Sequence, residues 1–261
     1  MLASQVLDLA IQRQDIWTYR MPNGPLTRLT SAPDAFYWAP RWTADGSTIR
    51  FGGVRKDDEV LYAVPGDGSR APEALLSRVG GFGWSIAYHP DGRRLATNTC
   101  VTTPAAGGGC RSRLAVLTIG SPDSIVVIED ADTQARYGEF SPDGRYLAYL
   151  AREVARHELY VRPLDGKGTR WRVSPTGAGR PRWSRDGRTL FYAANDSMYA
   201  AEWSAGTAQP VGAVRALFRL GTLGTIFDVL PGDSTFLMVA PNDAEHSRVV
   251  VVANFVRQLS R

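Results

Sequence analysis

The chain alternates short apolar stretches with polar turns, and one ten-residue pattern recurs along it. Each copy has an aromatic residue, then a turn containing Asp and Gly, then a strand whose apolar residues alternate. Four copies align without gaps, and they are Trp42–Phe51, Tyr88–Thr97, Phe140–Tyr149 and Trp183–Tyr192. A fifth copy, Val229–Met238, has the Asp and the Gly exchanged. A repeat of this kind decides the fold before any single residue does.

The spacing of the repeat matches one architecture. The aligned positions 45, 91, 143, 186 and 232 recur every 43 to 52 residues, which is typical of propeller blades with four strands each. We therefore predict an all-β chain, a β-propeller of four-stranded blades with five to six blades. Blades start near positions 38, 84, 136, 180 and 225, and residues 1–261 form a single domain.

The turn in each copy has a local physical explanation. Asp tolerates the middle of a tight turn, and the Gly after it accepts the left-handed conformation with which a hairpin resumes its twist. The aromatic residues Trp42, Tyr88, Phe140 and Trp183 share one register, so they are expected to pack between neighbouring sheets rather than to hold a ligand.

Further strands follow each hairpin, and the two ends of the chain are incomplete. The third strands are predicted at Val60–Val64, Arg113–Thr118, Glu158–Arg162 and Ser197–Trp203. Residues 15–30 resemble the third and fourth strands of a partial blade. At the other end we predict a third strand at Arg248–Phe255 and a short helical tail at 256–261. Either the N-terminal strands complete the last blade, or the ring is incomplete and the chain is the C-terminal piece of a longer protein.

Composition and charge exclude several classes of protein. Hydrophobic residues make up 44% and charged residues 21%, as in an ordinary globular chain. No apolar run approaches the about 18 residues of a membrane span, so we expect no membrane insertion. The net charge of +4 comes from scattered arginines with acids between them, so no nucleic-acid partner is expected.

Few residues suggest chemistry. The sequence has no nucleophile elbow, no zinc-protease motif and no phosphate-binding loop, so we predict that the chain is not an enzyme and binds no cofactor. His89, His157 and His246 have no metal-ligand spacing, and His89 occupies the serine position of its repeat. The turn explains Asp45, Asp91, Asp143 and Asp186 without calcium. We therefore predict no metal site.

Two cysteines flank a glycine-rich loop. Cys100 and Cys110 enclose nine residues between the second and third strands of one blade. Residues that face each other across an antiparallel ladder are within disulfide reach. A disulfide and a pair of reduced buried thiols therefore both remain open.

The best candidate binding site is the mouth of the central channel, where a propeller's loops and innermost strands converge. The residues just before the repeat aromatics point to the opposite side, and four of the five are charged: Arg41, Glu139, Arg182 and Asp228, with Ala87 as the fifth. These charges either contact a ligand or pair with one another. The segments Phe36–Trp38 and Gly80–Trp84 carry aromatics that suit a protein or peptide contact, with Trp38 and Trp84 as its anchors, or that pack between blades.

The pattern at Phe140–Tyr149 resembles the repeat of the TolB-type propellers. The ending, Phe227–Val239 followed by Val249–Leu259, is similar to the C-terminal sensor propeller of bacterial transmembrane serine/threonine kinases. The resemblance implies a non-catalytic, extracytoplasmic module that binds a partner or a ligand. We expect a protein, a peptide or a small ligand at one face of the propeller, and we expect the chain to be a monomer. The alternative is a sensor or accessory domain of a larger enzyme, for example a bacterial serine/threonine kinase or a prolyl oligopeptidase-type peptidase.

The start of the chain bears on where it works. The first fourteen residues have no basic segment and no sustained apolar run, so they make a poor signal peptide. A native N-terminus therefore predicts a cytoplasmic protein, whereas a fragment of a longer chain is expected in the periplasm or elsewhere outside the cytoplasm.

Overall fold

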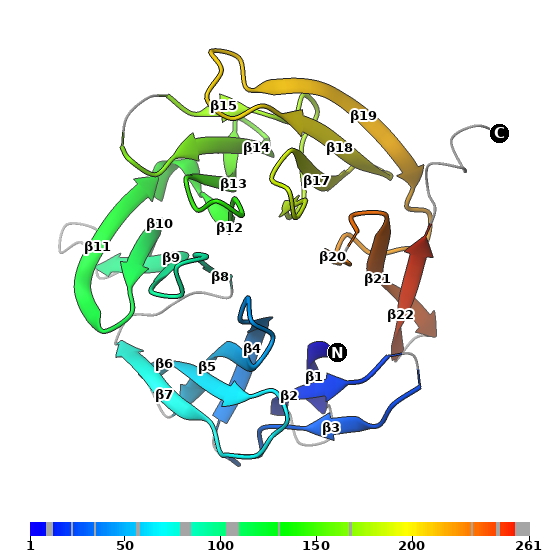
Figure 1. The fold of residues 1–261 in the computed structure, drawn as a ribbon. Coiled ribbons are helices and arrows are strands. Elements are labelled where there is room, and N and C mark those ends of the chain that lie inside the picture. Colours follow the sequence, from blue (N-terminus) through cyan, green and yellow to red (C-terminus); the bar gives the residue numbers. More distant parts are fainter. Residues whose placement is uncertain are drawn as a thin grey trace. The chain divides into compact units, whose positions relative to one another are not determined.

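The structure is a computed structural model of residues 1–261. It describes residues 1–8, 13–21, 23–33, 35–55, 58–78, 85–102, 110–129, 131–166, 169–230, 232–243 and 246–253. Within these ranges the strands form six antiparallel sheets, four with four strands and two with three (Figure 1). The prediction of an all-β chain built from four-stranded blades is confirmed. Two compact units, Met1–Arg136 and Tyr137–Arg261, divide the chain, and each is described by itself.

The first unit contains three sheets in sequence order. The first sheet consists of β1 (Leu2–Asp8), β2 (Arg13–Tyr19) and β3 (Leu26–Arg28). The second consists of β4 (Ala35–Trp42), β5 (Thr48–Arg55), β6 (Asp58–Pro65) and β7 (Glu73–Arg78). The third consists of β8 (Ile86–Tyr88), β9 (Arg94–Thr102), β10 (Cys110–Thr118) and β11 (Ser121–Glu129), with the 3-10 helix η2 (Ala131–Thr133) after it.

The second unit repeats this arrangement. Its first sheet consists of β12 (Arg136–Phe140), β13 (Tyr146–Glu153), β14 (Arg156–Pro163) and β15 (Trp171–Arg172). The next consists of β16 (Arg182–Trp183), β17 (Thr189–Ala194), β18 (Ser197–Trp203) and β19 (Val211–Arg219). The last consists of β20 (Phe227–Val229), β21 (Thr235–Asp243) and β22 (His246–Ala253). The predicted blade starts lie within three residues of the observed first residues 35, 86, 136, 182 and 227.

The repeat turns have the conformation that their sequence predicts. The glycines of the first four copies, at positions 46, 92, 144 and 187, have φ of 69° or 70°. In the fifth copy Asp233 takes this place with φ 54°, a conformation that Asp tolerates better than most residues. The aspartate of each of the first four turns accepts the amide of the second residue after it, at 2.8 to 3.1 Å. This bond is why Asp recurs in the repeat.

The core of each unit lies between neighbouring sheets. One position of the repeat, four residues after the aligned turn position, is fully buried in all five copies: Ile49, Leu95, Leu147, Leu190 and Phe236. In the first unit these residues join clusters between the first and second and between the second and third sheets. The second unit has the corresponding two clusters. The sheets are therefore held together by side chains that the repeat places in one register.

The two ends of the chain change the prediction in one respect. The first sheet has three strands and not the two predicted within residues 15–30, because Leu2–Asp8 pairs with β2 residue for residue. The third strand near the C-terminus is confirmed as β22, whereas the tail at 256–261 lies outside the described residues. A single domain over 1–261 stays a prediction. In the described part of the chain, no helix has the length and apolar character needed to cross a membrane.

Candidate functional site

Three of the predicted channel residues form one charged cluster in the second unit. Arg182, at the start of β16, lies with its Nε 3.3 Å from Oδ1 of Asp228 and its Nη1 3.4 Å from Oε2 of Glu139. Its Nη1 also donates to the carbonyl of Pro181 at 2.9 Å. Burial lowers the pKa of Arg182, but the charges of Glu139 and Asp228 outweigh burial and raise it. The guanidinium therefore stays charged between two carboxylates.

The cluster bears on the two expectations for these charges. Glu139, Arg182 and Asp228 pair with one another, as the second expectation states. The group has one cation and two anions, and the Asp228 side chain is 52% exposed. A contact from this cluster to a ligand stays a prediction.

Arg41 and Ala87 belong to the first unit. Arg41 pairs across the ladder with Arg50, whose guanidinium lies 5.6 Å from the centre of the Tyr88 ring. Burial raises the pKa of Tyr88, against the opposing charges of Arg50 and Arg41. Arg41 is therefore close to a buried phenol of its own unit, and its role as a ligand contact stays a prediction.

The two predicted aromatic anchors have different outcomes. Trp38 lies in β4 and is only 4% exposed, so the expectation of an accessible loop aromatic is wrong for it. It packs over Gly52, where an added Cβ would lie 2.7 Å from the indole Nε1. The alternative, packing between sheets, is correct for Trp38. Trp84 lies outside the described residues.

The strand register bears on the cysteine pair. Cys100 lies opposite Ser112, and Cys110 lies opposite Thr102, so the cysteines are a diagonal pair in the β9–β10 ladder. Diagonal neighbours are about 7 to 8 Å apart, at the outer limit of disulfide geometry. The side chains of both cysteines lie outside the described part of the chain, so the disulfide and the pair of reduced thiols both stay predictions. Two thiols that are alkylated in denatured protein without prior reduction would establish the reduced pair. A product that is alkylated only after reduction would establish the disulfide instead.

Local structure accounts for His89 and for the aspartates of the repeat turns. His89 Nδ1 accepts the amide of Asp91 at 3.1 Å, and its Nε2 lies 2.8 Å from Nη2 of Arg94. In two other turns the corresponding residue is a serine, Ser141 or Ser184, whose hydroxyl donates to the turn aspartate. Among the described residues no three His, Cys, Asp or Glu side chains are grouped so that they could hold a metal ion.

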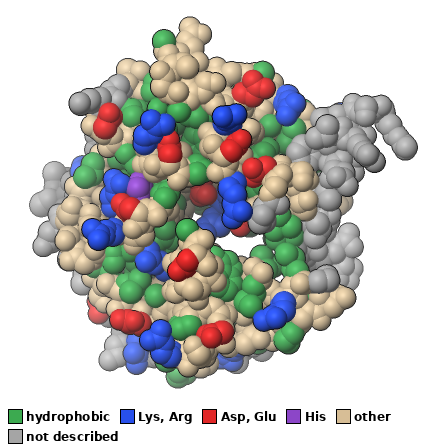
Figure 2. Space-filling model, viewed as in Figure 1, with side chains coloured by type: hydrophobic (Ala, Val, Ile, Leu, Met, Phe, Trp, Pro, Cys, Tyr) green, Lys and Arg blue, Asp and Glu red, His purple; other side chains and the backbone are tan. Residues whose placement is uncertain are grey.

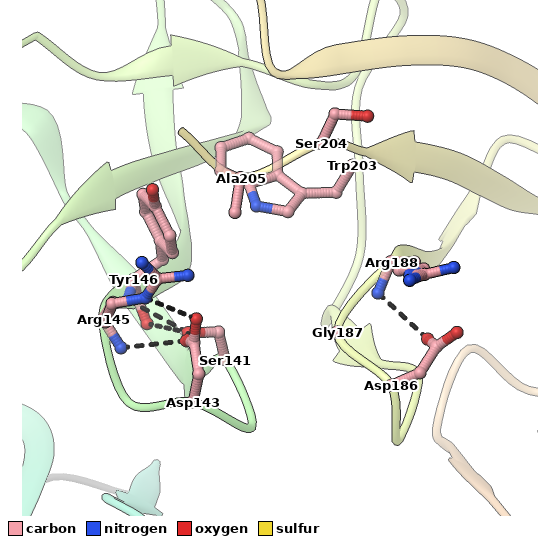
Figure 3. A pocket seen from close by; sticks show the side chains of 10 residues that line it. All are labelled: Ser141, Asp143, Arg145, Tyr146, Asp186, Gly187, Arg188, Trp203, Ser204 and Ala205. Atoms are coloured by element: carbon pink, nitrogen blue, oxygen red, sulfur yellow. Dashed lines mark hydrogen bonds and ion pairs between the residues drawn. The ribbon is translucent and has the colours of Figure 1, made fainter. Parts of the chain in front are cut away.

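A pocket of about 500 Å³ opens between the first two sheets of the second unit (Figure 3). Two repeat turns form its walls, one carrying Asp143 and Arg145 and the other carrying Asp186 and Arg188. Trp203, the last residue of β18, lies over the gap between the two turns. The sequence analysis does not single out this site, although the Asp-Gly-Arg triplets at 143–145 and 186–188 are a signal that could have found it.

The two walls differ in how their charges are satisfied. Arg145 Nε lies 2.7 Å from Oδ2 of Asp143, and burial of this carboxyl is outweighed by bonds from Ser141 and Arg145 that lower its pKa. On the other wall the Arg188 amide donates to Asp186 Oδ1 at 3.0 Å, and this bond is the main reason why the pKa of Asp186 is lowered. The guanidinium of Arg188 makes no hydrogen bond or ion pair within the described part of the chain (Figure 3).

Trp203 adds a second unsatisfied donor. The side chain is 4% exposed, and the rings of Tyr146, Trp171 and Trp183 pack edge-on against it at 5.2 to 5.7 Å. Its indole nitrogen has no hydrogen-bond partner among the residues that the structure describes, and it lies on the edge of the ring that faces the gap (Figure 3). Because Trp203 lines the pocket and its N–H has no partner there, this donor is available to a ligand.

Comparisons with solved structures identify the fold. TolB from Acinetobacter baumannii superposes with a TM-score of 0.74 at 14% identity, over 98% of this chain and 61% of that chain. The chain has the β-propeller fold of TolB. A putative TolB from Agrobacterium tumefaciens gives a TM-score of 0.63 at 17% identity, over 88% of this chain and 81% of that one. The predicted resemblance to TolB-type propellers is therefore confirmed at the level of fold.

The propeller fold also occurs in parts of longer enzymes. A structure of prolyl endopeptidases matches with a TM-score of 0.57 at 15% identity, over 93% of this chain and 38% of that chain. This chain spans about three fifths of the Acinetobacter TolB. No protein-family model matches the chain. No curated protein matches its sequence.

Proposed function

We propose that this chain is a non-catalytic, TolB-like binding module that takes a polar group of a protein, a peptide or a small ligand into the pocket below Trp203. One observation carries the proposal: two donors that lack partners, the Trp203 indole and the Arg188 guanidinium, adjoin one cavity. A cavity of about 500 Å³ is within the usual size range of ligand sites.

The lining favours an amide over a simple anion. Arg145 balances Asp143, and Arg188 balances the charge of Asp186, so the pocket has no net charge with which to attract an anion. Asp186 keeps one oxygen, Oδ2, without a bond among the described residues, and it lines the same pocket as the two free donors. An amide offers an acceptor and a donor close together, as does the backbone of a peptide. The proposed ligand is therefore a peptide segment or a small molecule with an amide group.

Titration with a blocked asparagine derivative, N-acetyl-asparagine amide, tests the pocket. The indole N–H signal of Trp203 in a ¹H–¹⁵N spectrum is expected to shift on binding. Arg188→Gln should weaken the interaction by about tenfold, because a hydrogen bond from a charged donor is worth about 1.5 to 3 kcal/mol. The shift is fitted to obtain the dissociation constant.

Arg185→Gln is the matched control. Arg185 lies in the same turn and is exposed, but it does not line the pocket. Its replacement should leave the dissociation constant unchanged. An unshifted Trp203 signal, or equal losses in the two variants, would refute the proposed site.

The other predicted properties are part of the same proposal. The Glu139–Arg182–Asp228 cluster is a second place where the module contacts a ligand, because charged side chains from three successive repeats meet there. The module acts as a monomer without nucleic acid, and Figure 2 shows acidic and basic side chains interspersed over the visible face of both units. In a longer chain it works in the periplasm or elsewhere outside the cytoplasm, as the resemblance to TolB-type propellers implies.

An accessory domain of a larger enzyme is the second candidate. It is favoured by the match to prolyl endopeptidases, in which a region of this fold makes up 38% of the chain. An open reading frame that continues from this chain into a hydrolase or kinase domain would support it. The link to a kinase sensor stays a prediction.

A further inference from the structure

One repeat carries an arginine where the other repeats carry a buried apolar residue. Arg50 follows the fully buried Ile49 in β5 and is itself partly buried. The same position in the other four copies holds an apolar residue that is at most 6% exposed: Ala96, Ala148, Phe191 or Leu237. A charged group that is taken out of water costs free energy unless it is paired, so packing alone does not explain Arg50.

The contacts of Arg50 leave part of its guanidinium unsatisfied. Its Nη1 donates to the carbonyl of Gly92 at 2.8 Å, and its Cζ lies 5.6 Å from the centre of the Tyr88 ring. These contacts join the second sheet to the third. Within the described residues its Nε and Nη2 have no hydrogen-bond partner, and the guanidinium has no ion pair. One positive charge and its free N–H groups therefore remain available.

The Tyr88 side chain supplies a second donor beside this charge. Tyr88 is the repeat aromatic of the third sheet, and the residues at that position in the other copies carry no hydroxyl: Trp42, Phe140, Trp183 and Val229. The Tyr88 hydroxyl is buried and has no hydrogen-bond partner among the residues that the structure describes. Burial raises the pKa of Tyr88, so the hydroxyl stays protonated and can donate. Buried hydroxyls usually have a partner, and here the acceptor is missing.

Arg41 adds positive charge at the same place. It lies opposite Arg50 in the β4–β5 ladder, so the two side chains project from the same face of the sheet. Its charge, like that of Arg50, acts on the Tyr88 hydroxyl. Arg41 has a further interaction of its own, so the unsatisfied donors are those of Arg50 and Tyr88. Both guanidinium charges favour an anion beside them.

The unsatisfied groups specify the chemistry of a ligand. All of them are donors, and one belongs to an unpaired cation, so the ligand must offer acceptors and a negative charge. A carboxylate has one charge and two acceptor oxygens, which match one guanidinium and one hydroxyl. Arg50 and Tyr88 are both partly exposed, so a small solute can reach them.

We propose that Arg50 and Tyr88 form a carboxylate-binding site between the second and third sheets of the first unit, and that it takes a small monocarboxylate. One carboxylate oxygen accepts hydrogen bonds from the free side of the Arg50 guanidinium, and the other accepts the Tyr88 hydroxyl. The site goes beyond the amide pocket, because it lies in the other unit and shares no residue with that pocket.

Propionate is the probe, and the full chain is titrated while a ¹H–¹⁵N spectrum follows the backbone amides of Tyr88 and Gly92. Both signals are expected to shift to saturation with propionate and to stay in place with propionamide or with sodium chloride at equal ionic strength. Tyr88→Phe should weaken binding by about tenfold, because it removes one hydrogen bond to a charged group and keeps the ring. Arg50→Gln should weaken binding at least as much, because it removes the charge.

Two controls separate binding from folding and from general charge. Tyr88→Phe should not lower the midpoint of thermal unfolding, because the hydroxyl that it removes has no partner among the described residues. Arg93→Gln makes the same charge change at an exposed residue next to Gly92 and should leave the dissociation constant unchanged.

Several results would overturn the proposal. They are no saturable shift, equal shifts with propionamide, an unchanged dissociation constant in Tyr88→Phe, equal losses in Arg50→Gln and Arg93→Gln, and tighter binding of inorganic phosphate than of propionate. A lower unfolding midpoint of Tyr88→Phe would show that the hydroxyl already has an acceptor, which also contradicts the site. Arg188→Gln should leave propionate binding intact, so failure of the pocket proposal is distinguishable from failure of this one.

Discussion

Replacing Glu158 by glutamine is expected to lower the free energy of unfolding by about 1.5 to 3 kcal/mol, the usual worth of hydrogen bonds to a buried charged group whose ionic partners are partly exposed. Glu158 lies in β14 and is 1% exposed. Its Oε1 lies 3.0 Å from Arg156 Nε and 3.0 Å from Arg172 Nη2. Its Oε2 accepts the Ser174 hydroxyl at 2.5 Å and the Gly177 amide at 2.8 Å. The glutamine side chain would carry an NH₂ group, which cannot accept the hydrogen bonds that a carboxylate oxygen accepts from Ser174 and Gly177. It would also remove the negative charge that attracts both arginines.

The pH dependence of this loss has a definite sign. Burial raises the pKa of Glu158, but the bonds from Ser174 and Gly177 and the charge of Arg172 outweigh burial and lower it. A carboxyl whose pKa is lower in the folded state stabilises the protein above its unfolded pKa, here 4.5, and loses this contribution as the pH falls through the folded value. The difference in stability between wild type and Glu158→Gln should therefore be largest near neutral pH and should shrink in acid.

Urea unfolding of the whole chain, followed by circular dichroism near neutral pH and again below pH 4.5, checks this expectation. Glu202→Gln is the control, because Glu202 is exposed on β18 of the same unit and should change stability by no more than about 0.5 kcal/mol. A difference that stays the same in acid would mean that Glu158 acts through its shape and not through its charge.

The Glu158 network has a counterpart that the sequence analysis also missed. In the first unit Asp15 is buried and pairs with Arg13 at 3.0 Å and Arg28 at 2.6 Å, and it accepts the Thr30 hydroxyl at 2.9 Å. Both sites have Arg-x-acid on one strand and Arg-x-Ser or Arg-x-Thr about fifteen residues later, at 13–15 with 28–30 and at 156–158 with 172–174. The sequence contains this signal, but paired charges in strands otherwise look like ordinary surface residues.

The fold was predictable because each turn carries its own explanation. The left-handed glycines and the aspartates that cap the turns are local features, and a spacing of 43 to 52 residues then gives the blades. β1 escaped prediction because Leu2–Asp8 has no repeat turn, and its place depends on pairing with β2.

The candidate site was harder to predict because it depends on how side chains meet. Trp38 looked accessible in the sequence, yet Gly52 on the next strand leaves the space that buries it. The register placed Glu139, Arg182 and Asp228 correctly at equivalent positions, but it could not distinguish mutual pairing from ligand contact. The pocket needs two separate turns and the end of β18 to converge, and no single stretch of sequence records that convergence.

Phe236→Ala is expected to destabilise the protein by about 3 to 5 kcal/mol, the usual cost of removing a buried aromatic ring. Phe236 occupies the repeat position that is Leu or Ile in the other four copies, and it is fully buried. The rings of Phe191, Phe218 and Phe227 pack edge-on against it at centroid distances of 5.2, 5.6 and 5.8 Å. The substitution would therefore open a cavity and remove three ring contacts together.

Phe236→Leu separates these two contributions, because it installs the residue that the other repeats prefer and keeps most of the volume. We expect it to cost about 1 to 2 kcal/mol, mainly the lost ring contacts. Leu26→Ala, at a side chain that is 57% exposed, should change the urea midpoint very little. Equal stability of Phe236→Leu and wild type would show that the fifth repeat needs only an apolar residue of sufficient size at this position. A loss between the control and Phe236→Ala would show that the ring contacts of Phe236 add stability that a leucine does not supply.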